Sequence, residues 1–178
     1  MNSLGSFVPL YVIFPKGICL SALALLAPQD LGSLQGPPPR THQFIAYAAE
    51  QQTVPVHRRT VVQLSFHVDS GYHVNSHTPK SELLIPTSIQ LQPTQGIKAD
   101  SLEYPAGKPY AFAFDPTEKL DVYADNFTVM VPVTAAAVGT YTLHGVLRYQ
   151  ACDKAACYPA RALPIDILLT ATSPSGTP

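Results

Sequence analysis

The feature that most restricts the fold is an alternation of apolar and polar residues between positions 41 and 172. The alternation is clearest in the segments 62–68, 127–133 and 141–149. A two-residue period predicts strands that bury one face. Shorter strands separated by turn-forming residues are predicted at 87–91, 97–103, 121–123 and 162–170.

Prolines exclude a long helical bundle. The 178 residues include 18 prolines spread along the chain, about twice the usual ~5%, and proline breaks helix interiors. After residue 41 no stretch of ten or more residues keeps a helical period, and the segment 46–52 has room for one helical turn. Seven or so short strands with regular turns predict an all-β fold, an immunoglobulin-like antiparallel β-sandwich, with a closed barrel as the alternative.

The charge balance excludes several classes of function. Lys and Arg number 11 against 12 Asp and Glu, which gives a formal net charge of −1. A nucleic-acid-binding domain normally has a basic surplus, so we predict no nucleic-acid partner. The balance also argues against a polybasic membrane-surface protein and against an acidic disordered tail.

The chain divides into four segments by composition. Residues 1–27 contain the apolar run 17–27 behind Lys16, which predicts a signal peptide or an N-terminal anchor and therefore an exported protein. We predict a Pro-rich linker at 28–40, the folded domain at 41–172 and a flexible tail at 173–178.

Two of the three cysteines lie close together in the folded segment. Four residues separate Cys152 from Cys157, and Cys19 falls in the leader. In an exported chain such a pair tends to form a disulfide. The spacing alone favours a structural staple and a redox pair equally. A metal site that adds His144 is a weaker third interpretation, because the spacing of zinc ribbons is missing.

Other sites have little support in the sequence. His67, His73 and His77 lie near one another, but Gly71 and the following residues predict a loop, so surface or hydrogen-bonding histidines are expected rather than a metal site. Neither a nucleophile elbow nor a glycine-rich phosphate loop is present. We therefore predict no cofactor and no metal.

The cysteine segment resembles a known signature. Tyr149-Gln150-Ala151-Cys152, followed by Cys157-Tyr158-Pro159, is similar to the active-site signature of the N-terminal periplasmic domain of the DsbD thiol:disulfide interchange proteins. The resemblance continues, in the family's order, through the segments 71–76, 84–87, 104–108 and 120–123. It implies an immunoglobulin-like sandwich, in agreement with the strand pattern.

The resemblance also implies residue roles. Cys157 would form mixed disulfides with thioredoxin-fold partners, and Cys152 would resolve them. Phe114, or else Phe112, would be the aromatic cap over the disulfide. Tyr149 and Tyr158, which flank the cysteines, would contribute to the cap or partner contacts. Asp115 or Glu118 close to the pair would raise the cysteine pKa and keep the reduced form unreactive.

Three features depart from the family pattern. The cysteine loop holds four residues where some members have five, and Ala160 follows Pro159 where a second proline is common. The sequence includes neither a multi-helix membrane domain nor a C-terminal thioredoxin-like domain. We therefore expect separate thioredoxin-fold donor and acceptor proteins, with a membrane electron carrier encoded separately. The alternative is a non-catalytic immunoglobulin-like interaction module with a structural disulfide.

Overall fold

The computed structural model describes residues 42–112 and 115–173. Within them the chain forms twelve strands and no helix long and apolar enough to cross a membrane. The strands are β1 (Ile45–Ala48), β2 (Gln51–Pro55), β3 (Thr60–Val68), β4 (His73–Asn75), β5 (Ser88–Leu91), β6 (Ile97–Ala99), β7 (Lys108–Phe112), β8 (Asp115–Tyr123), β9 (Asn126–Ala135), β10 (Gly139–Tyr149), β11 (Ala151–Cys152) and β12 (Arg161–Thr172).

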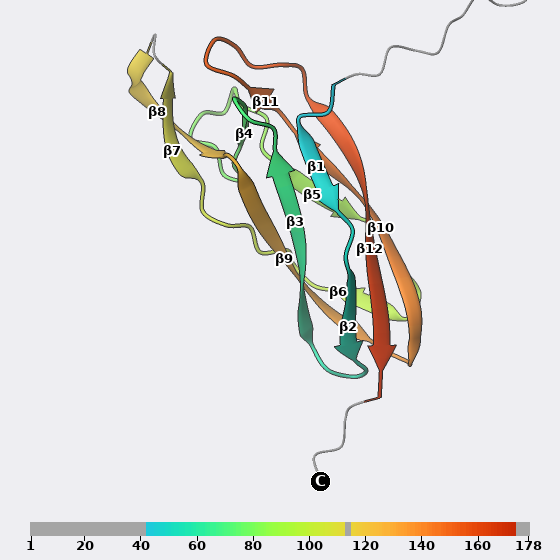
Figure 1. Ribbon diagram of the computed structural model, residues 1–178. Helices are drawn as coiled ribbons and strands as arrows, with labels where there is room; N and C mark the ends of the chain where they lie inside the picture. Colours follow the sequence, from blue (N-terminus) through green and yellow to red (C-terminus); the bar gives the residue numbers. More distant parts are fainter. Residues whose placement is uncertain (1–41, 113–114, 174–178) are drawn as a thin grey trace, which may run out of the picture. The chain divides into compact units, whose positions relative to one another are not determined.

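These strands build three four-stranded sheets (Figure 1). Sheet A has the order β1-β3-β9-β6, sheet B has the order β2-β12-β10-β5, and sheet C has the order β11-β4-β8-β7. Their named pairings are antiparallel except that of β2 with β12, which is parallel. The predicted all-β, immunoglobulin-like sandwich is confirmed.

The core lies between sheets A and B and follows from the alternation in the sequence. In β3, Val62, Leu64, Phe66 and Val68 are buried, while the residues between them are exposed. Side chains from β9, β10 and β12 join the same cluster: Val129, Val131, Val133, Leu143, Leu147, Tyr149, Ile165, Ile167 and Leu169. Burial of each such side chain contributes about 1.5–3 kcal/mol, so the sandwich has a core that is independent of the disulfide.

An aromatic row joins sheet A to sheet C. The ring centroids of Tyr47 and Phe66 are 5.3 Å apart, those of Phe66 and Phe127 are 5.0 Å apart, and those of Phe127 and Tyr123 are 4.6 Å apart. Between β8 and β9 the chain turns at Asp125, whose φ of 60° lies in the left-handed region that Asp tolerates better than most residues. The row and the turn fix β8 beside the sandwich.

The β7–β8 hairpin and the connection between β10 and β12 lie at the same end of the sandwich (Figure 1). At the start of the hairpin, Gly107 packs so closely that an added Cβ would lie 2.8 Å from Ser76 Cβ and 2.9 Å from Asp121 Cβ. The absence of a side chain at Gly107 therefore lets β7 approach the segment after β4. This end of the fold contains both segments that the sequence singles out, the cysteine pair and the cap.

Most predicted strands are present, with different lengths. The strands at 62–68, 127–133, 141–149 and 162–170 are confirmed in β3, β9, β10 and β12. β6 is shorter than predicted, and Glu103 instead forms an isolated bridge with Met130. The helical turn considered for 46–52 is wrong, because this segment supplies β1 to sheet A and β2 to sheet B. The sequence did not predict β4, β7 or β11.

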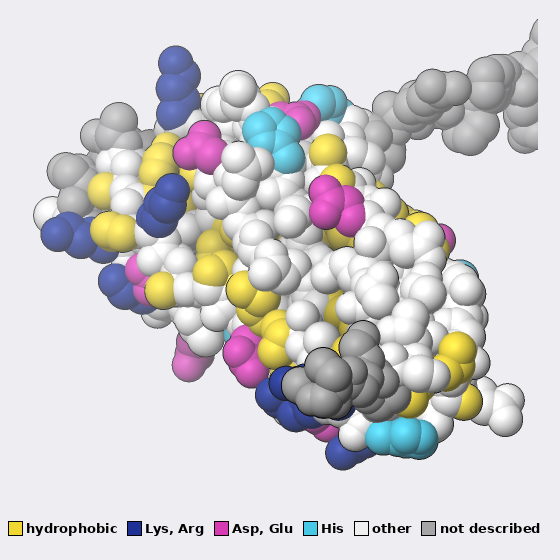
Figure 2. All heavy atoms as spheres, turned by 60° about the horizontal axis from the view of Figure 1, so that its bottom comes forward, with side chains coloured by type: hydrophobic (Ala, Val, Ile, Leu, Met, Phe, Trp, Pro, Cys, Tyr) yellow, Lys and Arg dark blue, Asp and Glu magenta, His cyan; other side chains and the backbone are white. Residues whose placement is uncertain are grey.

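The face that comes forward when the lower end of Figure 1 is turned toward the viewer is mixed in character. In the view of Figure 2, hydrophobic side chains occur in small groups between charged side chains and other atoms. Isolated exposed apolar residues are normal on a soluble domain. This view therefore gives no reason to place a docking surface there.

Candidate active-site disulfide

Cys152 and Cys157 form a disulfide in the connection between two long paired strands. β10 and β12 pair from Gly139 opposite Ala171 to Tyr149 opposite Arg161, so the residues between Tyr149 and Arg161 connect a hairpin. The S–S distance is 2.04 Å. The Tyr158 backbone N–H donates to the Ala151 carbonyl over 2.8 Å, which brings the two cysteines opposite each other.

The two sulfur-bearing residues differ in exposure. Cys152 lies in β11 and is 0% exposed, whereas Cys157 is exposed. A protein that approaches this end of the sandwich therefore reaches Cys157 first. Exchange requires a thiolate to reach one sulfur of the disulfide, and the exposure of Cys157 makes it the accessible position.

Asp153 organises the four residues between the cysteines. Its Oδ1 accepts hydrogen bonds from the backbone N–H groups of Ala155, at 2.7 Å, and Ala156, at 2.9 Å, and its Oδ2 accepts one from the Tyr158 hydroxyl at 2.7 Å. These donors lower the pKa of Asp153, because they stabilise the carboxylate. The same hydrogen bond from Tyr158 raises the pKa of that phenol to about 12. At neutral pH the loop between the cysteines is therefore held together by hydrogen bonds to the ionised carboxylate of Asp153.

An aromatic cluster of Phe44, Tyr72 and Tyr158 lies beside Cys157. The ring centroid of Phe44 is 4.8 Å from that of Tyr72 and 4.9 Å from that of Tyr158. The Arg161 guanidinium lies 5.8 Å from the Phe44 centroid, within cation–π range. Because Tyr158 follows Cys157 directly, this cluster provides an aromatic surface next to the exposed cysteine.

Gln150 connects this surface to the neighbouring loop. Its Oε1 accepts hydrogen bonds from Asn75 Nδ2 at 3.0 Å and from the Ile85 backbone N–H at 3.2 Å. Its Nε2 donates to the Tyr158 carbonyl at 3.2 Å. The amide of Gln150 therefore fixes the segment that follows Cys157 relative to β4 and the loop before β5.

His73 lies directly opposite Cys152 in the pairing of β4 with β11. Directly opposed side chains project from the same face, with Cβ atoms roughly 4.5–5.5 Å apart. The imidazole is 3% exposed, and its ring centroid lies 4.0 Å from that of Tyr110 and 6.1 Å from that of Phe112. Burial lowers the pKa of His73, and the Asp153 carboxylate opposes this effect. His73 is therefore neutral at neutral pH.

The site residues predicted from the sequence lie in different environments in the structure. Phe112 lies at the end of β7 in the same group as His73 and Tyr110. Phe114 lies outside the described residues, as do the side chains of Asp115 and Glu118. Tyr149 is 0% exposed, and its hydroxyl donates to Gln43 Oε1 over 2.8 Å. Tyr149 therefore lies in the core and supports the site from there.

Sequence reasoning missed Asp153, Phe44 and the position of His73. Asp153 had a local signal, because Asp at the start of a short loop commonly caps backbone N–H groups two and three residues on. The other two residues come from distant parts of the chain. The histidines considered together also separate: His67 Nδ1 lies 2.9 Å from Asn126 Oδ1, and His77 stacks on Tyr104 with centroids 3.7 Å apart. Among the described residues no group of His, Cys, Asp and Glu side chains has the arrangement of a metal site.

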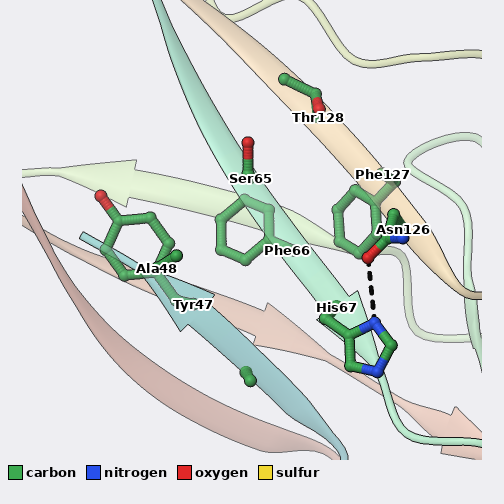
Figure 3. Close-up of a pocket in the computed structure, with 9 residues that line it drawn as sticks. Tyr47, Ala48, Ser65, Phe66, His67, Asn126, Phe127 and Thr128 are labelled. Carbon is green, nitrogen blue, oxygen red and sulfur yellow. Dashed lines mark hydrogen bonds between the residues drawn. The ribbon is translucent and has the colours of Figure 1, made fainter. Parts of the chain in front are cut away.

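A separate hollow of about 350 Å³ lies over β1, β3 and β9. Figure 3 shows the rings of Tyr47, Phe66 and Phe127 in it, with a hydrogen bond between His67 and Asn126 at one edge. Its lining contains neither cysteine nor carboxylate. Among the described residues its histidine, His67, pairs with the Asn126 amide rather than with a hydroxyl, so the disulfide remains the candidate site.

Fold and site together define an immunoglobulin-like sandwich domain with a disulfide in the connection between two paired strands. More particularly, the chain belongs to the family of the N-terminal domain of the thiol:disulfide interchange protein DsbD, whose family model matches residues 41–168. The resemblance noted in the sequence is thereby confirmed. No curated protein matches the chain.

Solved structures show similarity at low sequence identity. The reduced N-terminal domain of DsbD from Neisseria meningitidis is 22% identical, with a TM-score of 0.40 over 59% of this chain and 74% of that one. The same domain in complex with the PilB N-terminal domain is 20% identical, with a TM-score of 0.39 over 60% and 73%. The N-terminal periplasmic domain of ScsB from Proteus mirabilis is 11% identical, with a TM-score of 0.47 over 69% and 44%.

Proposed function

We propose that this protein is an exported thiol–disulfide exchange domain that relays reducing equivalents between thioredoxin-fold partners through Cys152 and Cys157. The observation that carries the proposal is the difference in exposure within the pair, with Cys157 exposed and Cys152 at 0%. An exchange domain needs one sulfur that a partner can attack and a second that stays next to it. Family membership supports the same assignment.

The chemistry runs in two exchanges that balance. In the first, a donor thiolate bonds to Cys157 Sγ, the Cys152–Cys157 bond breaks, and its electron pair remains on Cys152 Sγ. The donor's second thiol loses its proton, closes the donor disulfide and releases the Cys157 thiolate. In the second, the Cys157 thiolate attacks an acceptor disulfide, and Cys152 resolves the mixed disulfide. The two protons of the donor dithiol pass through the domain to the acceptor.

The location and partners follow from the leader and the family. We place the domain outside the cytoplasm, because residues 1–27 have the composition of a signal peptide or anchor. We further propose that 28–40 link this segment to a folded unit at 41–172, followed by a tail at 173–178. A thioredoxin-fold donor, a thioredoxin-fold acceptor and a membrane electron carrier complete the proposed pathway.

The reduction potential of the disulfide tests the proposal. An exchange pair is expected to be distinctly more oxidising than about −300 mV, below which structural disulfides lie. Equilibration with glutathione and with dithiothreitol, followed by quantification of free thiols, measures this quantity. A reduction potential below that limit would contradict the proposal and support the alternative function, a non-catalytic interaction module with a structural disulfide.

The cap hypothesis gives a separate prediction. Phe112 packs on the buried ring group beside Cys152, and Phe114 follows it by two positions in the sequence. Replacement of either residue by alanine is expected to speed reduction of the disulfide by a small thiol several-fold, because a shielding ring is lost. The effect of Phe114→Ala should be the larger. Val138→Ala, a truncation of an exposed residue after β9, serves as the control, and rates equal to the control in both cap variants would refute the cap.

A further inference from the structure

His73 presents a buried polar atom that nothing in the cap or exchange scheme uses. Its Nε2 is buried and, among the described residues, has no hydrogen-bond partner. Buried polar groups in native proteins nearly always have a partner, and an unpaired one in a native structure calls for an explanation. The imidazole projects from the same face as Cys152, which is its direct neighbour across the β4–β11 pairing.

Among the described residues, two aromatic rings and the cysteine loop surround the His73 imidazole. Tyr110 and Phe112 of β7 cover the ring. Asp153, the residue after Cys152, is the described charged group whose field acts on the imidazole. The same attraction contributes to the lowered pKa of Asp153. A negative charge on Cys152 would therefore arise in a pocket where water has little access.

Opening of the disulfide creates such a charge. In the oxidised pair the Cys152 sulfur is a weak acceptor. When a donor thiolate bonds to Cys157 Sγ, the electron pair of the broken bond stays on Cys152 Sγ, which becomes a strong acceptor. A buried anion without a hydrogen bond is unfavourable. Among the described residues, the unpartnered Nε2 of His73 is the group on this face that can satisfy it, in the tautomer of the neutral imidazole that carries its proton there.

We propose that the His73 imidazole donates a hydrogen bond to the Cys152 thiolate and so stabilises it as both leaving group and resolving nucleophile. This inference takes the roles of the two cysteines from the proposed function. It adds a residue that sets the reactivity of the buried sulfur, whereas the cap controls access to the pair. Tyr110 and Phe112 are then positioning residues, since they hold the ring against β11.

The direct test is the ionisation of Cys152 in the Cys157→Ser chain. Ultraviolet absorbance of the thiolate gives the pKa of Cys152 as a function of pH. When His73→Phe is added to this chain, the pKa of Cys152 is expected to rise by about one pH unit or more. This is the size of change expected when a thiolate loses a charge-assisted hydrogen bond. His73→Gln, which keeps an N–H donor, should restore part of the difference. An unchanged pKa in His73→Phe would overturn the proposal.

A matched control separates the effect of His73 from that of the hydroxyl of the neighbouring Tyr110. Tyr110→Phe keeps the ring that covers His73 and removes a hydroxyl, so the pKa of Cys152 should stay at its starting value. An equal rise in Tyr110→Phe would assign the effect to the Tyr110 hydroxyl and contradict the role of His73. In the chain with both cysteines, His73→Phe is expected to slow reduction by dithiothreitol about threefold, from the dependence of exchange rates on thiol pKa.

A measurement without mutation covers the case in which His73→Phe fails to fold. The nitrogen resonances of the His73 imidazole should differ between the oxidised chain and the chain reduced at a pH above the pKa of Cys152. Identical resonances would contradict the hydrogen bond. Failure of the proposed function is recognised separately, because a disulfide that never exchanges with a partner would still show the dependence of the Cys152 pKa on His73.

Discussion

A chain with Cys152→Ser is expected to accumulate a stable mixed disulfide through Cys157, whereas the chain with Cys157→Ser should form almost none. The reason is exposure: Cys157 is accessible, while Cys152 is 0% exposed and lies in β11, paired with β4. Loss of either cysteine also abolishes complete exchange, because one sulfur cannot accept and pass on two electrons. This is the largest effect predicted for a single substitution.

The trap can be made with a defined probe. A thioredoxin whose resolving cysteine is replaced by serine, and whose remaining cysteine carries an aromatic thiol as leaving group, captures an accessible thiolate as a covalent complex. Nonreducing electrophoresis and mass spectrometry identify the complex and the cysteine involved. A free aromatic disulfide of the same thiol is the control for intrinsic reactivity. Trapping by Cys157→Ser alone would reverse the two roles, and trapping by neither variant would indicate a structural staple.

Truncation of Tyr149 to alanine is expected to lower the free energy of unfolding by about 3–5 kcal/mol, the range for large aromatic residues in cores. The ring is 0% exposed within the core between sheets A and B. Its hydroxyl also accepts a hydrogen bond from the Phe44 backbone N–H at 3.3 Å and donates to Gln43. These contacts hold the segment before β1 against the end of β10.

The matched control is Tyr149→Phe, which removes the hydroxyl and keeps the ring. It should cost about 1 kcal/mol, the net value of a typical hydrogen bond. Urea denaturation with the disulfide intact measures both variants. A loss below about 1 kcal/mol for Tyr149→Ala would contradict the placement of this ring in the core, and would return Tyr149 to the surface role that the family resemblance implies.

The strands were predictable where the alternation was long. In β3, β9 and β10 the apolar residues of one face are buried over most of each strand, because a two-residue period leaves one register that buries them. The short strands β4 and β11 have three and two residues, too few for a period to be read. The segment 46–52 was misread for a related reason, since two short strands in different sheets share it.

The candidate site, too, was predictable where its residues are close together in the sequence and unpredictable where they are far apart. The cysteine pair and Tyr158 come from one continuous segment, and the order of residues around them indicates the family. Phe44 and Tyr72 reach Tyr158 from the segments before β1 and before β4. Their rings meet because the pairings of β1 with β3 and of β4 with β11 bring distant parts of the chain to one end of the sandwich.

By itself the sequence determined the all-β class, the strands with long alternation, the cysteine pair and the family, because each of these depends on residues close together in the chain. The tertiary structure decided which cysteine is buried and placed His73 opposite Cys152. It also put Tyr149 in the core and Asp153 at the centre of the loop's hydrogen bonds. Burial and electrostatic environment arise from contacts between distant segments, and these form when the sheets pair and pack.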